Sequence, residues 1–231
     1  MEYDQVELDA AYDQLQYAPL MGQNIKRQAS LSEEVRRSLG DPLRRKYGQS
    51  DVEELDIYRT NHPMAEQVRR GIAWVYQNAT SFGGDGNRLY IGGFSSGAHL
   101  CGVSLVTDWE KGFGLPSDFI KGGLCMSGIY DMKPVRLSKR SEYVKFDDDM
   151  EQAMSSQRQI ERLRVPLIVT YGTNDTPEFQ RQARDFAAAV KAAGKPVELV
   201  EAVNFGHMEM LESLGNPYGP NGRAALTLMK L

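Results

Sequence analysis

The sequence predicts an α/β fold, in which helices cover both faces of a mostly parallel β-sheet. Apolar runs of strand length alternate along the chain with longer segments whose apolar residues recur at helical spacing, and this alternation is typical of parallel sheets. A length of 231 residues is common for one large domain of this class. We therefore expect a single domain over residues 1–231.

The composition excludes several classes of partner. Hydrophobic residues make up 41% and charged residues 25% of the chain, as in ordinary globular proteins. The net charge of −4 does not provide the basic face that nucleic acid requires. No apolar stretch approaches the length of a membrane span, and the acidic N-terminus lacks the pattern of a signal peptide. We expect a cytoplasmic protein with a small-molecule partner, and the sequence indicates no particular oligomeric state.

The first quarter of the chain contains few strong patterns. Residues 1–29 show poor periodicity, whereas a capping box and a later glycine predict a helix over residues 30–40. The basic stretch Arg44–Lys46 is interpreted as the surface of a solvated helix, and Val52–Tyr58 alternates as a strand does. Pro63 then opens a helix whose apolar residues recur every three or four positions.

The rest of the chain holds the predicted sheet and its covering helices. Four segments are interpreted as strands, and the second and third of them as buried strands. They begin at Leu89 and continue at Phe119–Ile129, Pro166–Tyr171 and Val197–Val203. A long amphipathic helix is predicted between Pro177 and Gly194, and a last helix over Arg223–Leu231. The polar residues 133–163 are predicted to form a lid, or a helical excursion over the edge of the sheet.

The chain is organised around a glycine–serine motif between the first of these strands and a helix. The apolar run from Leu89 leads into Gly93–Gly97, whose sequence is GFSSG, and small and apolar residues continue as a helix. The G-x-S-x-G pattern is that of a nucleophile elbow, where a sharp turn exposes a strained serine. Glycine and serine also form ordinary turns, but the flanking strand and helix favour the elbow. Both glycines are expected to be required because side chains there would collide with the neighbouring strand and helix.

Three residues of complementary chemistry follow predicted strands. In such a sheet, reactive residues collect in the loops beyond the carboxyl ends of the strands. Ser95, Asp175 and His207 each occupy such a loop, and the order serine, acid, histidine is that of the α/β-hydrolases. A serine hydroxyl needs an imidazole to take its proton, and the imidazole needs a carboxylate to fix its tautomer. The sequence therefore predicts a catalytic triad of Ser95, His207 and Asp175.

Other residues compete for the roles of base and acid. His99 lies in the elbow helix, whose axis carries it away from the serine, and His62 stands beside a helix-opening proline, where a cap or loop role is expected. The assignment of His207 thus rests on elimination. Asp175 has an alternative role as a turn or N-cap residue, and Asp131 is the alternative acid because it also follows a predicted strand.

The oxyanion of the transition state requires two backbone N–H donors. One is predicted to be the amide of Ser96, at the positive end of the elbow helix. A second donor normally comes from a glycine-rich loop after an earlier strand.

No metal or organic cofactor is expected. The histidines, cysteines and carboxylates show no metal-ligand spacing. The glycine-rich turn at residues 82–87 lacks the Gly-Lys-Ser/Thr of a phosphate-binding loop. Cys101 and Cys125 are too few for a disulfide framework and lie in apolar segments, so we expect buried free thiols.

Taken together, these features resemble the α/β-hydrolase superfamily and, more narrowly, the arylformamidase (kynurenine formamidase)-like esterases. The resemblance covers most of the chain from about residue 3 onward. The matching stretches are Leu55–Tyr58, Trp74–Gly84, Gly93–His99, Asp175–Phe179 and Gly206-His207. Such enzymes hydrolyse carboxylic esters or aryl formamides without a metal or organic cofactor, so the resemblance implies the same chemistry here.

The chain departs from that family between Tyr58 and Pro63. In the family, a His-Gly-Gly loop supplies the second oxyanion donor, and a further helix and strand separate it from the helix before the elbow. Here only residues 59–62 intervene, and His62 is followed by proline, so the motif is not matched. So short a stretch cannot encode those elements, which predicts either an omitted segment near 59–63 or a deletion, and the matching flanks favour omission. Omission would leave consecutive Cα atoms there much more than ~3.8 Å apart.

The sequence thus predicts a serine hydrolase that cleaves a carboxylic ester or an aryl formamide through an acyl-enzyme on Ser95. The alternative is a non-catalytic small-molecule-binding protein on the same fold, since fold does not fix function. The intact triad favours catalysis, whereas the missing oxyanion loop favours the alternative. Tyr12, Tyr17 and Met21 are candidates to roof the site, although packing on the surface is the simpler interpretation.

Overall fold

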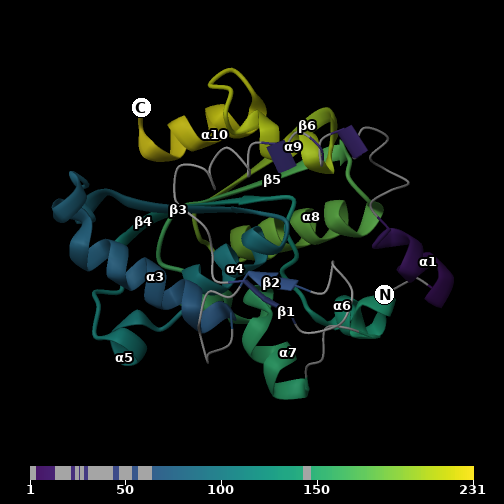
Figure 1. Cartoon of the computed structure of the whole chain (residues 1–231), viewed down its shortest axis with the longest axis horizontal. Helices are drawn as coiled ribbons and strands as arrows, with labels where there is room; N and C mark the ends of the chain where they lie inside the picture. The colour runs from purple at the N-terminus through teal and green to yellow at the C-terminus, as the bar shows by residue number, and fades with distance from the viewer. Residues whose placement is uncertain are drawn as a thin grey trace.

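The computed structural model describes residues 4–13, 22–23, 26, 29–30, 44–46, 54–56, 64–142 and 147–231. At the centre of this described part is a parallel sheet with the strand order β3-β4-β5-β6 (Figure 1). Its strands are β3 (Leu89–Phe94), β4 (Ile120–Met126), β5 (Leu167–Asn174) and β6 (Val197–Gly206). Each coincides with a segment that the sequence predicts to be a strand. The continuous apolar sequence of β4 and β5 fits their burial on both faces, whereas β6, at the edge of the described sheet, carries Glu198 and Glu201 and is mostly exposed or half-buried.

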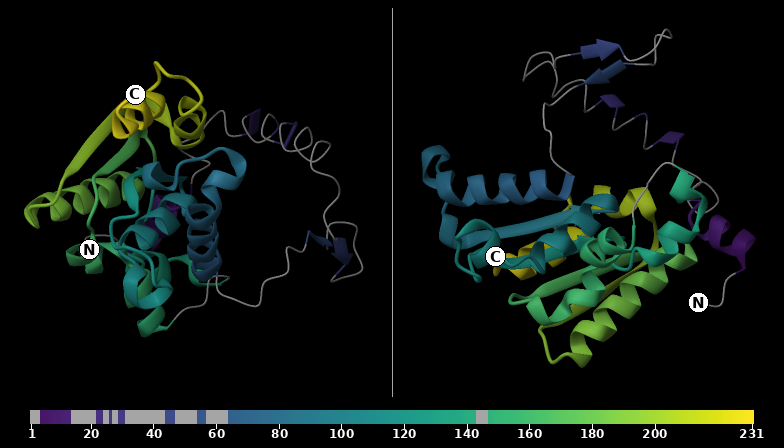
Figure 2. Two further views of the ribbon diagram at one scale, coloured as in Figure 1. Left: turned by 90° about the vertical axis from the view of Figure 1, so that its left-hand side faces the viewer. Right: turned by 90° about the horizontal axis from the view of Figure 1, so that it is seen from below.

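Helices cover both faces of this sheet, which confirms the α/β prediction (Figures 1 and 2). One face packs against α4 (Ser96–Leu105) and α8 (Pro177–Ala192), and the other against α9 (His207–Ser213) and α10 (Pro220–Met229). Helix α3 (Met64–Asn78) packs on α4 and adds Ile72 and Tyr76 to the core of the first face. In the first layer, Cys101 of α4 and Phe186 of α8 belong to the same core cluster as Val169 of β5. In the second layer, Ala224 of α10 packs with Ile168 of β5.

The ends of the covering helices follow from proline and glycine. Pro177 occupies the first turn of α8, where its missing N–H costs nothing, and Gly194, at a φ of 69°, follows the end of that helix. Pro220 likewise opens α10, three residues before the predicted start at Arg223. Because the four strands are parallel, the residues that follow β3, β5 and β6 lie at one edge of the sheet. No loop separates β6 from α9, so His207 opens a helix rather than occupying the predicted loop.

Short helices occupy the connections between the larger elements. They are η2 (Ala79–Phe82), η3 (Gly86–Arg88), α5 (Trp109–Phe113), α6 (Lys133–Leu137), η4 (Lys139–Glu142), α7 (Asp148–Met154) and η5 (Ser156–Arg162). The last four lie within the segment 133–163, which is therefore helical in its described parts. The lid role of this segment stays a prediction.

A short N-terminal helix, α1 (Gln5–Ala11), has no counterpart in the sequence prediction. Its N-cap is Asp4, whose side chain accepts a hydrogen bond from the Glu7 N–H (2.8 Å), while the Glu7 carboxylate accepts one from the Asp4 N–H (3.0 Å). Leu8 and Tyr12 are buried against Phe179 of α8. Periodicity did not reveal this helix, because its three buried residues, Leu8, Ala11 and Tyr12, span little more than one turn and the helical spacing is not repeated.

The N-terminal region also contains a small antiparallel pair, β1 (Arg44–Lys46) and β2 (Glu54–Asp56). The helical interpretation of Arg44–Lys46 is wrong, because three basic residues in a row carry no periodicity that separates a helix from a strand. Strand β2 lies within the predicted strand at Val52–Tyr58. The predicted helix at 30–40 (apart from Ser30) and the predicted omission near 59–63 fall outside the described residues.

Cys101 and Cys125 are buried free thiols, as predicted. A side-chain contact with Cys101, together with burial, raises the pKa of the Cys125 thiol, which therefore stays protonated. Within the described ranges, no helix is both long and apolar enough to cross a membrane.

Candidate active site

The predicted elbow has the geometry of a sharp strand-to-helix turn. β3 ends at Phe94 and α4 begins at Ser96, so Ser95 alone makes the turn. Its backbone has a φ of 56° and a ψ of −118°, a conformation that residues other than glycine rarely adopt. The Ser95 N–H donates to the carbonyl of Met126 on β4 (2.9 Å), which ties the turn to the sheet.

The two glycines of the motif differ in their surroundings. A Cβ at Gly93 would lie 2.1 Å from the Gly97 carbonyl oxygen and 2.7 Å from the Ala98 nitrogen. A Cβ at Gly97 would meet nothing within 4 Å. The expectation that both glycines are sterically required is therefore right for Gly93 and wrong for Gly97. The backbone of α4 approaches the strand at the first position and turns away from it at the second.

The structure brings the three predicted triad residues into one hydrogen-bonded chain. Nε2 of His207 lies 3.0 Å from Oγ of Ser95, and Nδ1 of His207 lies 2.6 Å from Oδ1 of Asp175. With a proton on Nδ1, the imidazole donates to the carboxylate and can accept from the serine hydroxyl. His207 is 4% exposed and Asp175 is fully buried, so this chain is shielded from water on the acid side.

The histidine is held by its own helix and by two aromatic rings. His207 is the first residue of α9, and the Glu209 carboxylate accepts a hydrogen bond from the Gly206 N–H (2.6 Å), which fastens that first turn. The imidazole lies 4.7 Å from the ring of Phe94 and 4.9 Å from the ring of Phe179, measured between centroids. The rings restrict how far the imidazole can rotate.

The acid is fixed by two further donors, one of which the sequence analysis missed. Oδ2 of Asp175 accepts from the Ser127 hydroxyl (2.6 Å) and from the Gly172 N–H (3.0 Å). Ser127 follows β4 directly and is fully buried. Its only sequence signal is a serine at the carboxyl end of a predicted strand, which is too common to single it out.

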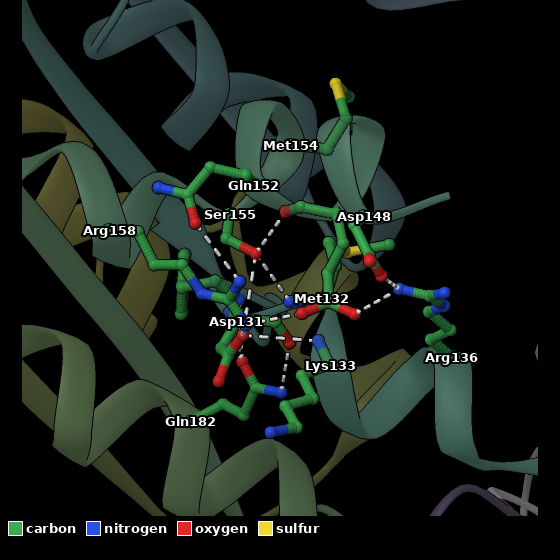
Figure 3. A network of polar contacts seen from close by, with 12 residues as sticks. Asp131, Met132, Lys133, Arg136, Asp148, Gln152, Met154, Ser155, Arg158 and Gln182 are labelled. Carbon is green, nitrogen blue, oxygen red and sulfur yellow. Dashed lines mark hydrogen bonds and ion pairs between the residues drawn. The ribbon is translucent and has the colours of Figure 1, made fainter. Parts of the chain in front are cut away.

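The alternative acid and base have other partners. The Asp131 carboxylate accepts from Arg158 (2.7 Å) within a polar network that joins the segment 133–163 to the body of the protein (Figure 3). Nε2 of His99 donates to the carbonyl of Met154 (2.8 Å), so His99 points away from the serine, as expected for its place in α4. His62 lies outside the described residues.

The backbone N–H of Ser96, the oxyanion donor predicted from the sequence, lies at the start of α4. Ser96 is the first residue of α4, so its N–H has no partner within the helix and lies at the positive end of the helix dipole. The stretch near 59–63, where the sequence departs from the family's second-donor loop, lies outside the described residues. Also among the described residues, no group of three or more His, Cys, Asp or Glu side chains could hold a metal ion.

Tyr12 of the N-terminal segment packs one layer behind the histidine. Its ring makes an edge contact with Phe179 (centroids 6.1 Å apart), and the guanidinium of Arg140 lies 5.0 Å above the Tyr12 ring. Burial, reinforced by the charge of Glu178, raises the pKa of Tyr12 well above its usual value, so the hydroxyl stays neutral. Tyr12 thus supports Phe179 rather than facing the serine. Tyr17 and Met21, the other two candidates for a roof, are not among the described residues.

Two apolar grooves flank β3, one on each face of the sheet. The first has a volume of about 520 Å³ and lies between β3, α3 and α4, with Val68 and Leu100 in its lining. The second has a volume of about 460 Å³ and is lined by Leu124 and Leu228 among others. Neither is lined by Ser95, Asp175 or His207, so the grooves are separate from the hydrogen-bonded chain.

The strand order, the elbow and the histidine directly after β6 place this fold in the α/β-hydrolase class. Within that class the chain belongs to the BD-FAE family, whose model matches residues 58–190. The match includes β3, β4 and β5 and most of α8, and it therefore covers the elbow and the acid.

The similar proteins of known name are hydrolases. Kynurenine formamidase of Danio rerio is 32% identical over 156 residues, which make up 65% of this chain and 51% of that protein. Esterase LipQ of Mycobacterium tuberculosis is 27% identical over 143 residues, 55% of this chain and 34% of LipQ. The chain thus spans about half, or less, of the length of these curated relatives.

A solved structure matches over nearly the whole chain. A protein of Silicibacter sp. TM1040, named as a candidate thioesterase, superposes with a TM-score of 0.67 at 19% identity. The superposition covers 97% of this chain and 99% of that one. At this identity, the similarity establishes the shared fold.

Proposed function

We propose that this protein is a serine hydrolase that cleaves a carboxylic ester or an aryl formamide through an acyl-enzyme on Ser95. The observation that carries the proposal is the hydrogen-bonded chain from Ser95 Oγ through His207 to Asp175, with distances of 3.0 Å and 2.6 Å. The strained backbone of Ser95 adds to it, because such strain persists in proteins chiefly where function requires it.

In the proposed acylation, Ser95 Oγ attacks the carbonyl carbon of the substrate while Nε2 of His207 takes the hydroxyl proton. Asp175 keeps the imidazole proton on Nδ1 and stabilises the imidazolium that forms. The tetrahedral intermediate places its negative oxygen toward the Ser96 N–H at the start of α4. The imidazolium then gives its proton to the leaving alcohol or amine, and the acyl group stays on Ser95.

Deacylation repeats these steps with water as the nucleophile. His207 takes a proton from the water as it attacks the acyl carbon, and then returns that proton to Ser95 Oγ as the carboxylic acid leaves. For a formamide substrate the released acid is formic acid. A formyl group needs little room, so a narrow acyl site would favour this substrate over larger esters.

The names of the relatives support both substrate classes. The Danio rerio relative is a kynurenine formamidase and the mycobacterial one is an esterase. Both chemistries attack an sp² carbonyl carbon and expel a heteroatom, so one triad serves either. We accordingly propose the reaction class for this chain, with the two substrate classes to be separated by measurement.

A fluorophosphonate probe tests the reaction class. It reacts only with a serine whose proton a neighbouring base can take, so we expect covalent labelling of the protein at Ser95 and none in Ser95→Ala. Ser104→Ala is the matched control, because it removes a buried hydroxyl that bonds within α4, and we expect it to label like the unmodified protein. Absence of labelling in the unmodified protein would favour the non-catalytic binding alternative.

A comparison of two substrates tests the substrate class. We would measure kcat/KM for p-nitrophenyl acetate and for N-formylkynurenine with the same preparation. Faster turnover of N-formylkynurenine supports a formamidase. Comparable or faster turnover of the ester assigns the protein to the esterases.

A further inference from the structure

Ser127 occupies a position where the backbone favours glycine. It is fully buried at the carboxyl end of β4, with a φ of 48°. Side chains crowd the backbone in this left-handed region, which glycine adopts freely. The Ser127 N–H donates to the carbonyl of Thr170 on β5 (2.8 Å), so pairing within the sheet holds the residue there. A serine here costs backbone strain that a glycine would avoid, which points to a role for the serine hydroxyl.

The hydroxyl of Ser127 is directed at the acid of the proposed triad. Oγ donates to Oδ2 of Asp175 over 2.6 Å, and the Gly172 N–H donates to the same oxygen over 3.0 Å. The other carboxylate oxygen, Oδ1, lies 2.6 Å from Nδ1 of His207. Two donors on one oxygen fix the plane of the carboxylate, which leaves the second oxygen aimed at the imidazole.

We propose that Ser127 is a positioning residue, which acts through Asp175 to hold His207 in the tautomer and orientation that proton transfer from Ser95 requires. This inference rests on the proposed function, since it assigns Ser127 a part in that reaction. Without the hydroxyl, Oδ2 of Asp175 keeps only the Gly172 N–H as a donor, so the carboxylate can rotate more freely about its Cβ–Cγ bond. Loss of one hydrogen bond to a charged group corresponds to a fall in kcat of roughly 10- to 100-fold.

A merely structural role is the competing explanation, because a buried carboxylate needs donors for stability as well. Substitutions at position 127 separate the two. Ser127→Gly removes the hydroxyl and relieves the backbone, whereas Ser127→Ala removes the hydroxyl and keeps the strain. Ser127→Thr keeps the hydroxyl and adds a methyl group at a strained, buried position. Ser104→Ala is again the control for loss of a buried hydroxyl.

Among the Ser127 variants, kcat and thermal stability should not follow the same order. We expect kcat for p-nitrophenyl acetate to fall equally in Ser127→Gly and Ser127→Ala, with KM unchanged, although thermal unfolding should show the glycine variant to be the more stable. Ser127→Thr should be the least stable variant and should restore most of kcat below its unfolding temperature. If activity followed stability instead, so that the glycine variant was the more active, the inference would be overturned. Unchanged kcat in both hydroxyl-free variants would overturn it too.

A second readout does not depend on turnover. The Nδ1 proton of His207, held between imidazole and carboxylate, should give a far-downfield proton NMR signal. In Ser127→Gly, we expect this signal to shift and to broaden by faster exchange, while Ser104→Ala leaves it in place. An unaltered signal in Ser127→Gly would overturn the inference whether or not the protein is a hydrolase. An altered signal together with no fluorophosphonate labelling of the unmodified protein would overturn the proposed function alone.

Discussion

Asp175 and Asp131 follow neighbouring parallel strands, yet only one of them faces the histidine. Asp175, after β5, is fully buried and is hydrogen-bonded to His207 and Ser127. The side chain of Asp131, in the loop after β4, is 29% exposed and binds Arg158. A carboxylate beyond the end of a strand is therefore not enough to form a triad. Its role depends on which side chains the rest of the fold brings to it.

The loop of Asp131 joins the segment 133–163 to the sheet instead (Figure 3). Glu151 of α7 accepts hydrogen bonds from Arg158 (2.8 Å) and from Arg136 (3.1 Å), and Arg158 reaches Asp131 from the same side. On the other side, Gln182 of α8 accepts from the Asp131 N–H (2.8 Å) and donates to its carbonyl (2.9 Å). One acidic loop thus aligns a base, while the other fastens a set of short helices.

The largest expected contrast between the two loops is in activity. Asp175→Asn keeps the shape of the side chain but replaces one carboxylate oxygen with an NH2 group. Because Ser127 and Gly172 donate to the remaining oxygen, the NH2 group faces Nδ1 of His207, whose N–H loses its acceptor. We expect kcat for p-nitrophenyl acetate to fall by about 10⁴-fold. Asp131→Asn makes the same chemical change one strand away and should leave kcat close to that of the unmodified protein. Equal losses in the two variants would contradict the assignment of the acid.

The next contrast is in stability. Glu151→Gln leaves two arginines with a neutral partner in a buried position, and we expect the unfolding free energy to fall by about 2 kcal/mol. Asp148→Asn is the matched control, because Asp148 also binds Arg136 but its side chain is 90% exposed, and solvent screens such pairs. Urea unfolding measures both variants. A loss in Asp148→Asn as large as that in Glu151→Gln would show that burial does not set the strength of this network.

Much of the catalytic side of the comparison could be predicted from the sequence. Strands buried on both faces give continuous apolar runs, and the elbow requires a glycine at Gly93, so both leave a local signal. Parallel strands bring their carboxyl ends to one edge, which is why Ser95, Asp175 and His207 could be grouped without a structure. These features follow from short-range pattern and from topology.

The features that escaped prediction depend on contacts between distant segments. The Ser127 hydroxyl meets Asp175 only when β4 and β5 pair. Arg158 meets Asp131 only when the intervening short helices fold back on the loop after β4. Helix α1 forms where Leu8 and Tyr12 find the surface of α8, without a periodic pattern of its own. The open surroundings of Gly97 follow from the direction in which α4 leaves the strand. Apart from the Asp4–Glu7 capping box at the start of α1, none of these leaves a local signal.

The smallest expected effect comes from His99, which links the two regions because it lies in α4 and donates to the Met154 carbonyl at the end of α7 (2.8 Å). Burial lowers the pKa of His99 below its usual value of about 6.5. The unfolded chain therefore binds the proton more readily, so stability is complete above about pH 6.5 and declines as the pH falls below it. His99→Gln keeps a donor but does not titrate. We expect urea unfolding to show a smaller loss of stability for this variant than for the unmodified protein between about pH 7.5 and about pH 5.5, and parallel curves would exclude His99 as the source.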